Sequence, residues 1–193
     1  MKLFPLFLGF YLFTILITDI TNAQTDDIAP IRSFYAKIAN EIAACKTDGE
    51  GEYQCTLLVS ELNVNAYNQM VPVVGTSTRN VKFWMAGKDF LTGNEELYND
   101  FDLARVDVKG QLSAFSWYEE YLFDKGKLIF YIYKSEAGEY RYYFKNNKLI
   151  KFLDKKLAEP THYLIEEERT QQQWLQIVTD AQNYYNCFKI FGF

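Results

Sequence analysis

The fold is decided between residues 103 and 153, where an apolar run, a polar turn and a second apolar run occur together three times. The three stretches are VDVKGQL at 106–112, LFDKGKLI at 122–129 and YFKNNKLI at 143–150. Gly and Asn tolerate the positive φ angles that two-residue hairpin loops require. The pattern therefore predicts three antiparallel hairpins, with turns at Lys109-Gly110, Lys125-Gly126 and Asn146-Asn147.

The strands of these hairpins are rich in aromatic residues, with 13 of them between residues 115 and 152. Side chains alternate between the two faces of a strand, so residues 128–133 separate into an aliphatic set and a tyrosine set. The first set is Leu128, Phe130 and Ile132, and the second is Ile129, Tyr131 and Tyr133. In the partner strand, the same alternation sets Tyr140, Tyr142 and Phe144 against Arg141 and Tyr143.

Helices are expected on both sides of the strand region in the sequence. Residues 29–45 have apolar side chains at helical spacing after an acidic start and Pro30, and residues 170–188 repeat that spacing after a capping-box pattern at Thr170. Residues 53–62 and 79–86 are predicted strands. We expect an α+β fold, an antiparallel meander of about six to eight strands flanked by both helices, which pack on its aliphatic face.

The N-terminus has the pattern of a secretory signal peptide. Lys2 is followed by an apolar run from Leu3 to Ile17 and by small residues before a predicted cut after Ala23. A membrane anchor is the alternative, but a run of about 15 residues is shorter than the roughly 18 to 20 that span a bilayer. Residues 1–23 are therefore predicted to be removed, leaving residues 24–193 as one secreted or periplasmic domain with no transmembrane segment.

Three cysteines follow the predicted cut. Export exposes them to oxidising conditions, and Cys45 with Cys55 is the most local pairing, across a polar loop. Pairing of either with Cys187 stays open, and the thiol left over is expected to be a small buried side chain. The spacing of these cysteines does not suggest a metal site, and no cofactor motif is visible. The formal net charge of -5 and the dispersed lysines argue against nucleic acid as a partner.

Catalytic candidates are few. His162 is the only histidine, and no residue nearby in the sequence supports it as a base. Glu119 and Glu120 lie side by side in a predicted strand and should point to opposite faces, so that one of them meets the aromatic layer. A glycosidase needs two carboxyl groups across a cleft, one of them with a raised pKa. Glu119 and Glu120 are the best enzymatic candidates. The alternative is that they are solvated charges on an edge strand, with no catalytic role.

Aromatic residues supply the main binding candidate. A face carrying Tyr131, Tyr133 and Tyr143, with Trp117 nearby, could stack on sugar rings or receive a protein, although tyrosines also fill half-buried sheet faces. The first functional hypothesis is an exported, non-enzymatic binding domain whose partner is a protein or a glycan. A small secreted hydrolase acting through paired carboxylates is the second. An envelope structural protein or an inhibitor is the third.

Overall fold

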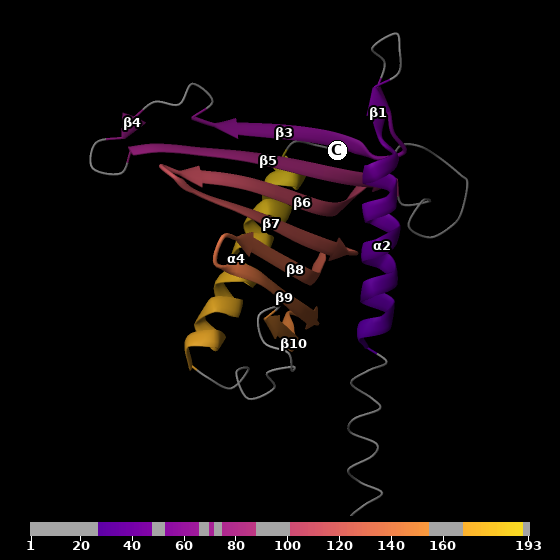
Figure 1. The fold of residues 1–193 in the computed structure, drawn as a ribbon. Coiled ribbons are helices and arrows are strands. Elements are labelled where there is room, and N and C mark those ends of the chain that lie inside the picture. Colours follow the sequence, from indigo (N-terminus) through magenta and orange to yellow (C-terminus); the bar gives the residue numbers. More distant parts are fainter. Residues whose placement is uncertain are drawn as a thin grey trace, which may run out of the picture.

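The computed structural model describes residues 27–47, 53–65, 70–71, 75–87, 101–154 and 168–190. It shows the α+β arrangement predicted from the sequence: an antiparallel meander with one helix before it and one after it in the chain (Figure 1). The elements are α2 (Ile28–Ala44), β1 (Lys46–Thr47), β2 (Tyr53–Gln54), β3 (Leu58–Val64), β4 (Met70–Val71), β5 (Gly75–Gly87), β6 (Phe101–Leu112), β7 (Phe115–Asp124), β8 (Lys127–Ser135), β9 (Gly138–Lys145), β10 (Lys148–Asp154) and α4 (Glu168–Ile190).

The main sheet has the strand order β10-β9-β8-β7-β6-β5-β3, with every neighbouring pair antiparallel, and β4 pairs with the start of β5. Two of the three predicted turns are confirmed. Lys125 and Gly126 both have positive φ between β7 and β8, and Asn146 and Asn147 do so between β9 and β10. Positive φ at both central residues is the requirement of a type I′ turn, which explains the residues found there.

The first predicted turn is wrong. Lys109 and Gly110 lie inside β6, opposite Tyr118 and Trp117 of β7, and the chain reverses instead at Ser113. A Cβ atom on Gly110 would come within 2.1 Å of the Trp117 ring. Gly110 is therefore needed because the Trp117 indole lies close to the backbone of β6. Glycine serves this purpose in strands as well as in turns, and the sequence alone does not distinguish the two.

The two helices pack on opposite faces of the sheet, so the expectation that they share the aliphatic face is wrong (Figure 1). Both apolar stripes are those predicted. Ile31 and Ile38 of α2 pack with Trp84 and other residues of one face, whereas Ile177 and Phe188 of α4 belong to the core of the other. Burial of aromatic side chains is favourable in the same way as burial of aliphatic ones. The aromatic face is therefore covered too, by α4.

A β-bulge changes the predicted alternation in β8. Leu122 pairs with Phe130 and Phe123 pairs with Leu128, which leaves Ile129 as the extra residue. Leu128 consequently joins Tyr131 on the α4 side, while Phe130 and Ile132 face α2. One inserted residue reverses the face of everything before it, and the period-2 pattern of the sequence does not reveal where the insertion falls.

The cysteines pair as the most local alternative predicted: Cys45 and Cys55 form a disulfide, and Cys187 of α4 is a free thiol. Cys187 is exposed, which corrects the expectation of a buried side chain. The predicted strand at 53–62 is divided into β2 and β3 around the bridged Cys55. Neither helix of the described ranges combines the length and the apolar character needed to cross a membrane. The predicted signal peptide and cleavage site lie outside the described residues.

Candidate functional site

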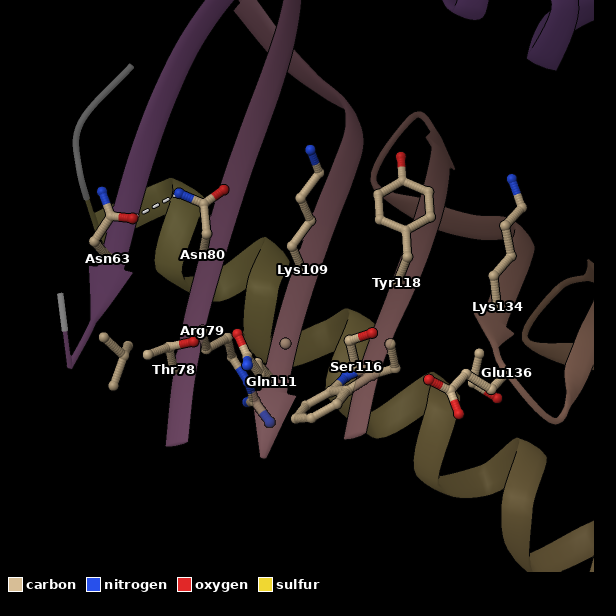
Figure 2. A pocket seen from close by; sticks show the side chains of 14 residues that line it. Asn63, Thr78, Arg79, Asn80, Lys109, Gln111, Ser116, Tyr118, Lys134 and Glu136 are labelled. Atoms are coloured by element: carbon tan, nitrogen blue, oxygen red, sulfur yellow. Dashed lines mark hydrogen bonds between the residues drawn. The ribbon is translucent and has the colours of Figure 1, made fainter. Parts of the chain in front are cut away.

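A row of five polar side chains crosses the α2 side of the sheet, one from each of five neighbouring strands. The strand registers place them directly opposite one another, and Figure 2 shows them directed to the same side, with α4 behind the strands. We call this set the cross-strand polar row; in order it comprises Asn63, Asn80, Lys109, Tyr118 and Lys134. Neighbouring strands lie about 4.8 Å apart, so the row extends over about 19 Å.

The row forms the floor of an open groove of about 660 Å³. Thr78, Gln111 and Ser116 line the groove beside the row, and Glu136 stands at its rim after β8 (Figure 2). Lys109, Gln111 and Ser116 are exposed, while Tyr118 and Lys134 are half-buried. The groove therefore offers amide, hydroxyl and ammonium groups to solvent on a rigid sheet.

The groove is open because α2 covers only one end of this face. The helix packs over the register row that contains Trp84, Leu122 and Phe130. The polar row lies four residues further along each strand, about 14 Å away at the usual rise of a strand. Asp107 and Glu120 occupy the row between the two.

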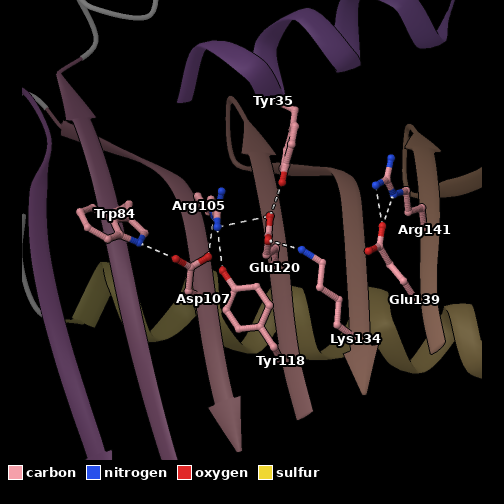
Figure 3. Close-up of polar contacts among 9 residues, drawn as sticks. All are labelled: Tyr35, Trp84, Arg105, Asp107, Tyr118, Glu120, Lys134, Glu139 and Arg141. Carbon is pink, nitrogen blue, oxygen red and sulfur yellow. Dashed lines mark hydrogen bonds and ion pairs between the residues drawn. The ribbon is translucent and has the colours of Figure 1, made fainter. Parts of the chain in front are cut away.

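An ionic network borders the groove on the side of α2, and its seven members come from α2, β5, β6, β7 and β8 (Figure 3). We call it the Arg105 network; it consists of Tyr35, Trp84, Arg105, Asp107, Tyr118, Glu120 and Lys134. The guanidinium of Arg105 bonds Asp107 through Nε at 2.5 Å and lies 3.3 Å from Oε2 of Glu120. Arg105, Asp107 and Glu120 are all buried residues, so the network holds their charges by mutual pairing.

The carboxylates of the network are fully engaged. Asp107 also accepts a hydrogen bond of 2.9 Å from the indole of Trp84. Glu120 also accepts one of 2.8 Å from the Tyr35 hydroxyl and lies 3.4 Å from the Lys134 ammonium. Coulombic attraction by Asp107 and Glu120 raises the pKa of Arg105 against the opposing effect of burial, so this side chain stays charged.

The network also fixes one member of the polar row. Nη2 of Arg105 donates a hydrogen bond of 2.8 Å to the hydroxyl oxygen of Tyr118. A guanidinium has no acceptor, so the phenol must be the acceptor of this bond and keeps its own proton for another partner. Burial, with a contribution from Asp107, raises the pKa of Tyr118, which keeps that proton in place at neutral pH.

The predicted tyrosines do not lie together on one open face. Tyr131 is buried and Tyr133 is partly buried under α4, whereas Tyr143 is buried on the α2 side and packs against Phe130. Trp117 lies on the α4 side, where its indole donates a hydrogen bond of 2.8 Å to Glu119. The structure therefore brings Tyr131 and Tyr133 together but separates both from Tyr143.

Glu119 and Glu120 point to opposite faces, as predicted. Glu119 meets the aromatic layer, where it accepts a hydrogen bond from the Tyr121 hydroxyl, and Glu120 belongs to the Arg105 network. Burial and Glu119 together raise the pKa of Tyr121. The two carboxyl groups thus do not face each other across a cleft. His162 lies outside the described residues.

Sequence reasoning missed the polar row altogether. Its members lie between residues 63 and 134, and their alignment depends on the pairing of five strands. The signal that could have indicated it is weak: Lys109, Tyr118 and Lys134 are polar residues at solvent-facing strand positions. Among the residues that the structure describes, no group of three His, Cys, Asp or Glu side chains could hold a metal ion.

Searches against protein-family models, curated proteins and solved structures return no match to this chain.

Proposed function

We propose that this protein is an exported, non-enzymatic binding domain that takes an oligosaccharide across the cross-strand polar row. The observation that carries the proposal is the row itself: five aligned polar side chains left uncovered in a groove of about 660 Å³. An extended chain of sugar rings presents hydroxyl groups in series. Amide, phenol and ammonium side chains at regular spacing are suitable partners for such a series.

The floor of the groove favours a glycan over a protein partner. Protein interfaces rely on buried aromatic or apolar anchors at their centre. The groove is lined mainly by polar and charged side chains, and its larger apolar side chains, Val64, Trp117 and Tyr118, are a minority of the lining. Four of the five strands that carry the row, β5 to β8, have a neighbouring strand on each side, and β3 lies at the edge of the sheet. A peptide could not add itself as a further strand at those four.

The engaged carboxylates favour binding over hydrolysis. Glu119 and Glu120 lie on opposite faces, and each is held by hydrogen bonds to neighbouring side chains. A glycosidase needs two carboxyl groups on either side of one scissile bond. Export is supported by the Cys45–Cys55 disulfide, which persists in oxidising compartments, together with the predicted N-terminal signal.

The proposal is tested by titrating ¹⁵N-labelled protein with neutral and acidic oligosaccharides of matched length and following backbone amide shifts. We expect shifts at Asn80, Lys109 and Tyr118, with residues of α4 unaffected. Replacing Gln111 by Ala in the groove should weaken binding about threefold to tenfold, the effect of one hydrogen bond. The matched control, Gln182→Ala on exposed α4, should leave affinity unchanged. Shifts confined to α4, or none with any glycan, would refute the proposal.

A further inference from the structure

We infer that the oligosaccharide is acidic and that its carboxylate or sulfate group lies between Lys109 and Lys134, on the hydroxyl of Tyr118. The inference rests on the proposed function and specifies the ligand class for the same groove. It follows from the hydrogen-bonding character of the three central residues of the polar row.

The centre of the row consists only of donors. Lys109 and Lys134 stand on either side of Tyr118, each one strand away from it, so their backbones are about 10 Å apart. An ammonium has three donors and no acceptor. The Tyr118 hydroxyl accepts its hydrogen bond from Arg105, so its own proton is left to donate to a ligand. A group placed on Tyr118 must be an acceptor, and a negative charge on it strengthens all three bonds.

The two lysines are available for this role. Lys109 is exposed and has neither an ion-pair nor a hydrogen-bond partner within the described part of the chain. Lys134 lies 3.4 Å from Glu120 and over the Tyr118 ring at 5.4 Å, and its side chain remains 39% exposed. Oε2 of Glu120 keeps Arg105 and Tyr35 when Lys134 turns toward a ligand, and Lys134 then exchanges its 3.4 Å contact with Oε1 for the anionic group of the ligand.

Glu120 contacts Lys134 at 3.4 Å, and the other carboxylates around the centre are engaged elsewhere. Asp107 and Glu120 are bonded within the Arg105 network, Glu139 is paired with Arg141, and Glu61 is paired with Lys82. Glu136 stands exposed in the turn at the rim. An anion on Tyr118 would therefore meet two ammonium groups first, in a protein whose overall charge is negative.

The test compares affinities of the full mature chain for oligogalacturonate, for sulfated heparin oligosaccharides and for neutral malto- and cello-oligosaccharides of the same length, by calorimetry at low and at physiological salt. We expect at least about tenfold tighter binding of one acidic series, with affinity falling as salt rises. The two acidic probes distinguish carboxylate from sulfate as the preferred group.

Two substitutions locate the charge. Lys109→Gln and Tyr118→Phe should each weaken the acidic series about tenfold and the neutral series little, because each removes a donor to a charged acceptor. Lys148→Gln, the same charge change at the exposed first residue of β10, should have no effect. Circular dichroism of Tyr118→Phe checks that the fold is retained. Lys109→Gln replaces an exposed side chain, so it tests the site even if Tyr118→Phe disturbs the fold.

Four outcomes overturn the inference. Equal affinity for acidic and neutral oligosaccharides, still sensitive to Gln111→Ala, would refute the acidic ligand and leave the binding function in place. Equal losses from Lys109→Gln and Lys148→Gln would show a diffuse charge effect instead of a site. Equal binding of single-stranded DNA would show that the groove takes any polyanion. Absence of binding to every glycan would refute the proposed function as well.

Discussion

The hydroxyl of Tyr35 on α2 donates a hydrogen bond of 2.8 Å to Oε2 of Glu120 in β7, the same carboxylate oxygen that faces Arg105 (Figure 3). The two residues are 85 positions apart in the sequence. Through this bond the N-terminal helix is joined to the network that orients Tyr118 at the centre of the groove. The position of α2 and the geometry of the polar row are therefore physically linked.

Tyr35→Phe should lower the free energy of unfolding by about 1–3 kcal/mol, because it removes a partner from a buried carboxylate without changing the ring. Urea denaturation measures the loss. The matched control is Tyr142→Phe, since the hydroxyl of Tyr142 has no hydrogen-bond partner among the described residues. An equal loss in both variants would show that the Tyr35–Glu120 bond contributes nothing specific.

Gly110→Ala should destabilise the protein by about 1–3 kcal/mol, the usual cost of overpacking. The added methyl group would lie 2.1 Å from the Trp117 ring, which must move away from β6 and from its hydrogen bond to Glu119. Gly87→Ala is the control, because a Cβ atom there meets nothing within 4 Å. Thermal unfolding with tryptophan fluorescence follows both effects. Unchanged stability and fluorescence in Gly110→Ala would contradict the packing described for β6.

Stability should fall at alkaline pH. Burial is the largest cause that raises the pKa of Tyr35, Tyr142 and Tyr184 from 10.0 to about 12. Between these values the unfolded chain releases protons that the folded protein retains, so the stabilisation is complete below pH 10 and is lost as the pH rises to 12. Urea unfolding at pH 8, 10 and 12 measures it. A stability that stays flat over that interval would show that these phenols titrate as if they were exposed.

Removal of the disulfide by Cys45→Ser with Cys55→Ser should cost about 2–3 kcal/mol, the chain-entropy value for a short loop. The two cysteines are separated by 10 positions. Cys187→Ser, at the exposed free thiol, should leave stability unchanged and serves as the control. Chemical denaturation with and without a reductant gives the same comparison in the natural chain. If reduction leaves the denaturation midpoint unchanged, the bridge does not stabilise this fold.

Several features of this protein follow from local backbone preferences, and the sequence alone determined them. The helix predicted at residues 29–45 is α2, Ile28–Ala44, because its apolar spacing and Pro30 lie within the segment and Asp27 directly precedes it. The turns at Lys125-Gly126 and Asn146-Asn147 follow from residues that tolerate positive φ. The opposed directions of Glu119 and Glu120 follow from the alternation of any strand.

Register and burial depend on partners distant in the sequence, and only the tertiary structure decided them. Gly110 has the appearance of a turn residue until Trp117 is placed over it, and Leu128 changes face because of a bulge opposite Leu122 and Phe123. The face that carries Tyr131 and Tyr142 is a core because α4 packs on it. No local sequence pattern shows which face of the sheet a distant helix covers. The cross-strand polar row exists only once five strands are aligned, since its spacing runs perpendicular to the chain.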